Sequence, residues 1–250
     1  MNGATVASPM STIASFHLTR YRPRHAPAAM AGRVSRKRVL AATPGLRFAR
    51  ELGTGRGSAM GLGADLRRWA TFAVWESDAA LDTFLASSPL ARRWQEQGEE
   101  SWTVRLVPLS AHGAWGGLRP LADVDPAASD DGPVAVLTRA RIGLRHWPAF
   151  YRSVAVVEAD LQRQPGLLAV VGIGEAPVGL QATFSLWRSP ADVAAFAYGE
   201  SSHQAVVRRT REEGWFVEEL FARFRPYRST GTWDGVDPLT DLGRAAGNGS

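Results

Sequence analysis

Two stretches of this chain carry the same pattern of residues, and this internal repeat limits the possible folds more than any other feature. Pro27 and Pro148 each stand near the start of a helical pattern. Pro44 and Pro165 each begin a Pro-Gly-Leu sequence that ends it. Both pairs are 121 positions apart. Because an apolar, β-branched stretch precedes each helix, each copy is predicted to open with a strand followed by a helix.

The order of elements within each copy predicts a ferredoxin-like half. A second and a third strand follow, and Ser77 and Ser189 come directly after them as helix-capping residues. A further short helix and a last strand complete each copy, which finishes in a Gly-x-Trp-x-Gly turn. The predicted strands are Thr12–Tyr21, Leu46–Thr54, Ala70–Trp75 and Thr103–Leu109 in the first copy, and Val134–Ile142, Leu167–Glu175, Ala182–Trp187 and Phe216–Arg225 in the second.

This β-α-β-β-α-(α)-β order is that of the ferredoxin-like split βαβ unit. Its sheet has helices on one face, and the other face must pack on something. We therefore predict an α+β protein in which two tandem ferredoxin-like repeats form an intramolecular α+β barrel. The expected divisions are a disordered tail over 1–11, a first half over 12–117, a linker over 118–132, a second half over 133–235 and a loose tail over 236–250.

The composition excludes several chemistries. The chain has no cysteine, so it forms no disulfide and has no thiolate ligand. No apolar run approaches the ~20 residues of a membrane span, and no nucleic-acid motif is present. A cytoplasmic protein without a nucleic-acid partner is expected. A basic N-terminal cluster is interpreted as a solvated face, with an acidic partner or an anionic membrane surface as the alternatives. It comprises Arg20, Arg22, Arg24, Arg33, Arg36, Lys37 and Arg38.

His203 is the candidate functional residue, because it departs from the repeat. Trp102 and Trp215, taken as matching ends of the short helix, are 113 positions apart, and this spacing aligns Leu90 with His203. A capping-box pattern at Ser201 predicts that a helix begins there and turns His203 to its apolar side. Burying an imidazole where a leucine suffices costs free energy unless the ring is hydrogen-bonded or ligated.

From the residues alone, two interpretations of His203 stay open. It is either a core histidine satisfied by a backbone carbonyl or a ligand, for example of haem iron through Nε2. His112, which precedes the first Gly-x-Trp turn, is the second choice as a ligand. His17 can face either side of its strand, and His25 and His146 are expected at the surface. No two histidines have the spacing of a zinc site.

Several segments along the chain carry a resemblance to a known family. They are Thr43–Leu46, Glu99–Trp102, Gly132–Ala140, Gly172–Glu175, Ala182–Trp187, His203, Arg211–Trp215 and Glu218–Phe224. On these residues, the chain from Ser15 to Leu239 resembles the spheroidene monooxygenase family of carotenoid biosynthesis. The resemblance implies a haem-dependent oxygenase that forms a C-2 ketone on an acyclic carotenoid. Dioxygen would be the oxidant and reduced ferredoxin the electron donor.

The architecture is also similar to that of dimeric α+β barrel haem enzymes, in which the proximal histidine lies on a helix of the C-terminal half. This similarity implies haem b as the cofactor and His203, in the second half, as the axial ligand of its iron. Arg139, Arg208 and Arg209 are alternative partners for the haem propionates. Membrane association through the basic N-terminal cluster and a homodimer stay open.

Three other interpretations compete with the monooxygenase. In the first, the protein binds haem but catalyses a dehydratase or peroxidase-like reaction on a small polar substrate. The second is a cofactor-free α+β barrel, either a binding module or an oxygenase of the antibiotic-biosynthesis type. The third is a purely structural oligomer module. A buried His203 that is satisfied by protein groups alone, with no cavity beside it, would favour the cofactor-free barrel.

Overall fold

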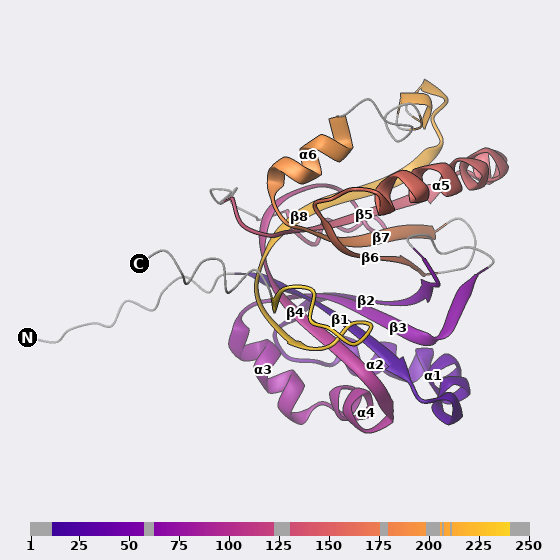
Figure 1. Cartoon of the computed structure of the whole chain (residues 1–250). Coiled ribbons are helices and arrows are strands. Elements are labelled where there is room, and N and C mark those ends of the chain that lie inside the picture. The colour runs from indigo at the N-terminus through magenta and orange to yellow at the C-terminus, as the bar shows by residue number, and fades with distance from the viewer. Residues whose placement is uncertain are drawn as a thin grey trace, which may run out of the picture.

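The computed structural model describes residues 12–57, 63–122, 131–175, 180–198, 206, 208–210 and 212–240. Eight antiparallel strands close into a barrel in the order β1-β3-β2-β6-β7-β5-β8-β4. The helices lie outside it, with α1 to α4 on one side and α5 and α6 on the other (Figure 1). The prediction of two tandem ferredoxin-like repeats in one α+β barrel is confirmed.

Each half supplies four strands and its own helices. The first half contains β1 (Ile13–Tyr21), η1 (Pro23–His25), α1 (Ala26–Ala31), α2 (Arg33–Ala41), β2 (Leu46–Gly55), β3 (Ala64–Trp75), α3 (Asp78–Ser87), α4 (Pro89–Gln97) and β4 (Gly98–Gly113). The second contains β5 (Val134–Ile142), η2 (Leu144–His146), α5 (Trp147–Gln162), β6 (Leu167–Gly174), β7 (Leu180–Trp187), α6 (Pro190–Tyr198) and β8 (Phe216–Gly231). Residues 206, 208–210 and 212 are helical as well.

The predicted serine caps are present in both halves. Ser77 Oγ accepts a hydrogen bond from the backbone N–H of Ala80 at the start of α3. Ser189 Oγ accepts one from the N–H of Asp192 at the start of α6. Each cap satisfies a helical N–H that has no partner within its helix. The two helices therefore begin at corresponding places in the repeat.

The last strand of each half is longer than the sequence predicts, and one predicted helix end is wrong. β4 and β8 have 16 residues each. Trp102 lies inside β4, because α4 already ends at Gln97. In register, Tyr21 of β1 lies opposite Gly98 of β4.

The corresponding pair in the second half is Ile142 of β5 with Phe216 of β8. The last strands are thus related by 118 positions, and the counterpart of Trp102 is Leu220, not Trp215. The spacing that aligns Leu90 with His203 does not hold within these strands, and His203 itself lies outside the described residues.

Both Gly-x-Trp turns pack their tryptophan into the barrel. Trp115 bridges to Leu118 and Trp233 bridges to Val236, and both indoles are buried. Glu218 on β8 accepts hydrogen bonds from the N–H groups of Gly116 and Gly117, so the second half holds the turn of the first. Burial raises the pKa of Glu218, but these N–H groups and Arg139 outweigh it and bring the pKa to about 2.

The chain stays packed beyond residue 235, where the sequence predicts a loose tail. Asp237 accepts a hydrogen bond from Trp102 Nε1 at 3.0 Å and another from Ser229 Oγ at 2.6 Å. Leu239 packs against the barrel core. Residues 241–250 and the expected tail over 1–11 lie outside the described residues.

Aromatic side chains from both halves fill the barrel interior. Phe16 stacks on Phe184 across the barrel with ring centroids 3.9 Å apart. Trp115 stacks on Phe72 at 5.9 Å, and Phe224 contacts Phe72 from β8. These side chains belong to the largest buried apolar cluster of the described residues, so the interior is a packed core. A ligand of any size must therefore bind between the sheet and the helices or at the barrel rim.

Candidate functional site

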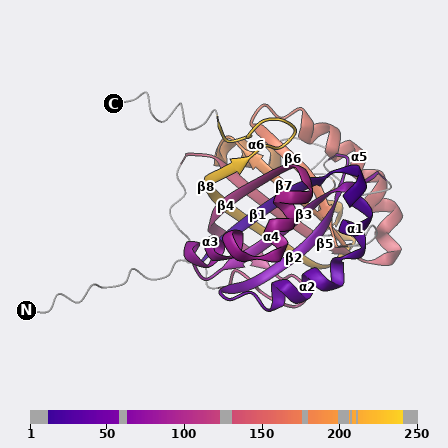
Figure 2. The ribbon, with the colours of Figure 1, turned by 90° about the horizontal axis from the view of Figure 1, so that it is seen from below.

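The helices of the first half cover their side of the barrel with a filled apolar layer. Leu81 and Phe84 of α3 and Leu90 and Trp94 of α4 are buried in it. The Phe84 ring contacts Trp75 of β3, with centroids 5.1 Å apart. Figure 2 shows α4 lying across the strands of this half. The layer is a second hydrophobic core.

His17 points into this layer and is a satisfied core histidine. The residue is 2 % exposed, and its ring stacks on Trp94. Nε2 lies 2.8 Å from Ser15 Oγ, and Nδ1 lies 3.0 Å from Thr103 Oγ1. Burial, with a smaller effect from Arg105, lowers the pKa of His17 to about 3. The imidazole is neutral at pH 7, and both ring nitrogens are engaged by protein.

Arg105 on β4 is held against α3 by two carboxylates. Its Nη1 donates to Asp78 Oδ1 at 2.5 Å, and its Nη2 donates to Asp82. The Tyr227 hydroxyl also donates to Asp78 at 2.7 Å. Burial alone would lower the pKa of Arg105, but the two carboxylates outweigh burial and the pKa is raised. The first half therefore neutralises its buried cation with its own helix.

The layer under the helices of the second half is sparser among the described residues. Its buried apolar cluster has five members, against eleven in the first half. They are Val134, Val136, Leu161, Trp187 and Val193, with Leu167, Val170, Phe196 and Phe221 partly buried beside them. In α6, Val193 is the buried residue.

Three side chains from β4 and β8 line this sparser layer. His112 pairs with Phe221 in register, and their rings stack with centroids 5.4 Å apart. The guanidinium of Arg223 lies 5.4 Å from the centroid of the same Phe221 ring. Arg223 Nε is buried and has no hydrogen-bond acceptor among the described residues. No sequence pattern points to Arg223, because only the strand register shows what it faces.

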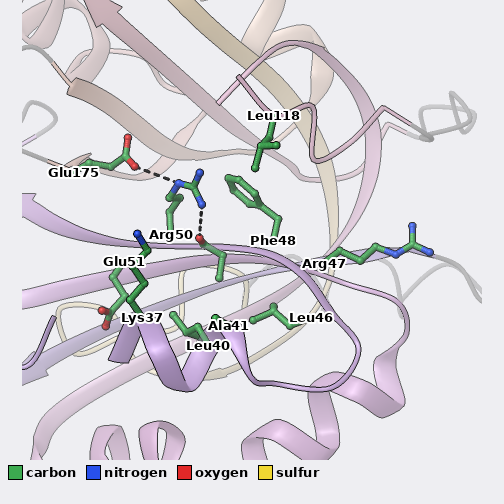
Figure 3. A pocket seen from close by; sticks show the side chains of 11 residues that line it. Lys37, Leu40, Ala41, Leu46, Arg47, Phe48, Arg50, Glu51, Leu118 and Glu175 are labelled. Carbon is green, nitrogen blue, oxygen red and sulfur yellow. Dashed lines mark hydrogen bonds and ion pairs between the residues drawn. The ribbon is translucent and has the colours of Figure 1, made fainter. Parts of the chain in front are cut away.

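The described part of the chain contains at least two clefts. The larger, of about 660 Å³, lies on the first half between α2 and β2, with Glu175 and Leu118 on its far wall (Figure 3). Arg50 crosses it to reach Glu175 at 3.2 Å and lies over the Phe48 ring. The smaller, of about 360 Å³, is lined by His112 and by Arg119 and its neighbours. The smaller cleft adjoins the sparser layer through His112.

The arginines proposed for the propionates are engaged by protein carboxylates. Arg139 is buried and pairs with Glu175 and Glu218. Arg209 pairs with Glu213 at 2.6 Å. Its guanidinium also lies over a tryptophan ring.

Arg208 is largely exposed and lies 3.9 Å from Glu212. In the basic N-terminal cluster, Arg36 is buried against Glu51 and Arg20 pairs with Asp234. That cluster is therefore partly structural. The expectation that all of it forms a solvated face is wrong for Arg36.

One described residue of the second half fits a haem. A haem needs cations for its propionates, and Arg223 has a buried Nε without an acceptor in the described part of the chain. Within the described residues no group of three metal-ligating side chains is found. His203, the predicted axial ligand, falls outside them.

None of the described helices is long and apolar enough to cross a membrane.

Comparison with known proteins gives close sequence relatives. No protein-family model matches the chain. A spheroidene monooxygenase of Rhodobacter capsulatus is 38% identical over 204 residues, covering 81% of this chain and 85% of that enzyme. A spheroidene monooxygenase of Rubrivivax gelatinosus is 38% identical over 192 residues, covering 77% and 73%. Among solved structures, an aldoxime dehydratase has a TM-score of 0.56 at 13% identity, covering 89% and 84%. At that identity the last likeness shows the fold alone.

Proposed function

Since the chain belongs to the spheroidene monooxygenase family, and is therefore an oxidoreductase of the monooxygenase class, we propose that it oxidises an acyclic carotenoid with the help of haem b. Sequence identity to the named relatives is the observation that carries this function. The apolar side chains on the helix-covered face of the second half could pack against a flat apolar cofactor. The proposed axial ligand is His203.

The proposed reaction forms a ketone at C-2 through two successive hydroxylations. Each hydroxylation consumes one dioxygen, two electrons and two protons, and releases one water. The resulting geminal diol loses water to give the ketone. Bound haem would supply the dioxygen chemistry, and reduced ferredoxin is proposed as the electron donor.

The protein's own part in this proposal is binding, orientation and exclusion of water. The apolar side chains of the layer, among them Trp187 and Val136, would keep the reacting carbon away from bulk solvent. Arg223, whose Nε is buried and has no acceptor among the described residues, is available to an anionic group.

The cofactor is tested by an absorption titration of the purified protein with haem. Wild type is expected to develop a Soret band that saturates at about one haem per chain. His203→Ala is expected to lose or shift that band, and His112→Ala serves as the matched histidine control. An unchanged spectrum in His203→Ala combined with a shift in His112→Ala would make His112 the ligand. No haem uptake by wild type would leave the cofactor-free barrel as the better account.

Turnover is tested with the haem-loaded protein, reduced ferredoxin and an acyclic carotenoid carrying a tertiary methoxy end group. The expected product is the C-2 ketone, identified by mass, with the label of ¹⁸O₂ in the hydroxyl intermediate. A small aldoxime is included as a second substrate, because the fold is shared with an aldoxime dehydratase. If the protein converts the aldoxime but leaves the carotenoid unchanged, the proposed function is overturned.

A further inference from the structure

The two halves treat one arginine differently. Arg105 of β4 lies opposite Ser15 of β1, and Arg223 of β8 lies opposite Val136 of β5. Ser15 and Val136 are 121 positions apart and occupy the same place in the repeat. Arg223 is therefore the counterpart of Arg105 on the other side of the barrel.

The carboxylates that hold Arg105 have no counterparts at the matching positions of α6. Helices α3 and α6 each begin three residues after the tryptophan that ends the preceding strand. By this correspondence, the places of Asp78 and Asp82 in α3 are taken by Pro190 and Ala194 in α6. Neither residue carries a charge or a side-chain acceptor. The second half has kept the arginine, and α6 offers it neither of these two counter-ions.

Arg223 is nevertheless drawn into the protein. Its Nε is buried and meets no acceptor in the part of the chain that the structure describes. Its guanidinium lies over Phe221, which packs in one cluster with Val193 and Phe196 of α6. Burying even one N–H of a guanidinium without an acceptor is unfavourable, because the lost hydration is not replaced. A site of this kind gains free energy when an anion arrives.

We propose that Arg223 anchors a carboxylate-binding site between β8 and α6, and that its ligand is a propionate of the bound haem. The fork of N–H groups on a guanidinium matches the two oxygens of a carboxylate. The neighbouring apolar cluster suits a carboxylate that is attached to a flat apolar body. The identity of the ligand rests on the proposed function, whereas the anion site rests on the broken symmetry alone.

The anion site is tested first in the haem-free protein, by thermal unfolding. Ala194→Asp restores the missing counter-ion, and Ala194→Asn is its uncharged control of equal size. Ala194→Asp is expected to unfold about 2–4 °C above Ala194→Asn. This gain is expected to vanish when Arg223→Met is added. Arg223→Met alone is expected to keep the wild-type midpoint or raise it, whereas Arg105→Met lowers it.

The identity of the ligand is tested by comparing haem with haem dimethyl ester, in which both propionates are blocked. Wild type is expected to bind haem about tenfold more tightly than the ester, since a hydrogen bond to a charged group is lost. Arg223→Met and Ala194→Asp are expected to bind the two alike. A preference for haem that persists in Arg223→Met would overturn the propionate assignment.

The two failures are distinguishable. If wild type binds neither haem nor its ester, the proposed function fails, and the unfolding midpoints still decide the anion site. Two results would show that the protein itself neutralises Arg223. One is an equal unfolding midpoint for Ala194→Asp and Ala194→Asn, and the other is an equal drop in midpoint for Arg223→Met and Arg105→Met. The anion site is then wrong even in a protein that binds haem.

Discussion

At the scale of single residues, His17 shows how a buried polar group is accommodated without any ligand. Trp75 donates to Ser15 Oγ at 2.8 Å, and Ser15, His17 and Thr103 continue the hydrogen-bonded row. The row ties β1 to its two neighbouring strands, β3 and β4. Such a network specifies the packing of a core when every member is satisfied.

His17 is expected to make stability depend on pH. In the unfolded chain His17 binds a proton at the ordinary histidine pKa of 6.5, whereas in the folded chain it binds one only at a pKa of about 3. Its contribution is therefore complete above pH 6.5 and is lost as the pH falls toward 3, by up to about 1.4 kcal/mol per pH unit. His17→Thr, which copies Thr138 at the corresponding position, is expected to flatten this slope. Urea unfolding between pH 7 and 4 measures it, and parallel curves for the two proteins would contradict the assignment.

Glu218 is expected to stabilise the first Gly-x-Trp turn by about 1–3 kcal/mol, as a charged acceptor of hydrogen bonds. Glu218→Gln should lose that amount at pH 7, while Glu219→Gln, next to it and exposed, should change little. The pKa of Glu218 is depressed to about 2. Its contribution is therefore present above the unfolded pKa of 4.5 and fades as the pH falls toward 2. Urea unfolding at pH 7 and pH 3 checks both statements, and an equal loss for the two variants at pH 7 would argue against the assignment.

The residue-level site is only partly predictable from the sequence. His203 stands out because it breaks an alignment, and that alignment uses two tryptophans that do not correspond in the strands. Arg223 matches Arg105 in the repeat but lacks the two carboxylates that pair with Arg105. This difference is found only through the strand register. A strand register is set by long-range pairing, and a single sequence does not display it.

At the scale of elements, the two Gly-x-Trp turns depend on glycines that no other residue can replace cheaply. Gly113 and Gly231 have φ of 90° and 84°, and a Cβ at either would overlap a carbonyl oxygen of the strand alongside. Gly235 has a φ of 88° but open space around it. All three glycines have a positive φ, so the difference between them lies in the close approach of a neighbouring backbone. Gly113 and Gly231 have such a neighbour, and Gly235 has none within 4 Å.

Gly231→Ala is accordingly expected to cost about 2–4 kcal/mol, because it adds an overlap with Ser101 to the strain of a positive φ. Gly235→Ala should cost only about 1 kcal/mol, from φ alone. The free energy of unfolding in urea measures the difference. Equal losses in the two variants would show that the turn yields to relieve the overlap.

Element types are predictable where hydrophobic alternation is strong. β5, from Val134 to Ile142, has the predicted bounds, and β2 and β6 differ from theirs by one residue. β4 extends beyond its predicted bounds at both ends. Its first residues, Gly98 to Ser101, lack the apolar alternation of a strand, so their sequence does not predict one. Their strand conformation comes from pairing with β1, which is a tertiary effect.

At the scale of the whole molecule, the two seams that join the halves are unequal. β4 and β8 pair from Trp102 with Gly231 to Gly113 with Leu220. On the other side, the pairing of β2 with β6 is confined to Gly53 with Gly174 and the next residue pair along, among the described strands. Gly172 N–H adds one hydrogen bond to Gly57 O at 2.9 Å. The barrel is therefore held closed mainly through β4 and β8.

Hydrogen exchange is expected to reveal this inequality. Amides at the β2–β6 seam, such as those of Gly172 and Gly174, should exchange through local opening at low free energy. Amides in the middle of the β4–β8 seam, such as that of Val107, should exchange only near the global free energy of unfolding. Mass spectrometry of peptides from each seam makes the comparison. Equal protection at both seams would show that the packed interior, with its stacked Phe16 and Phe184, keeps the weak seam shut.

The long pairing of β8 also affects when the barrel can close during protein synthesis. β8 is the last strand in the sequence, yet it completes the edges of both β4 and β5. While residues 216–231 are still inside the ribosome, the emerging first half exposes β4 as a 16-residue edge with unpaired N–H and C=O groups. Closure must therefore await the emergence of β8 from the ribosome. A nascent chain stalled before Phe216 should depend on a chaperone to stay unaggregated.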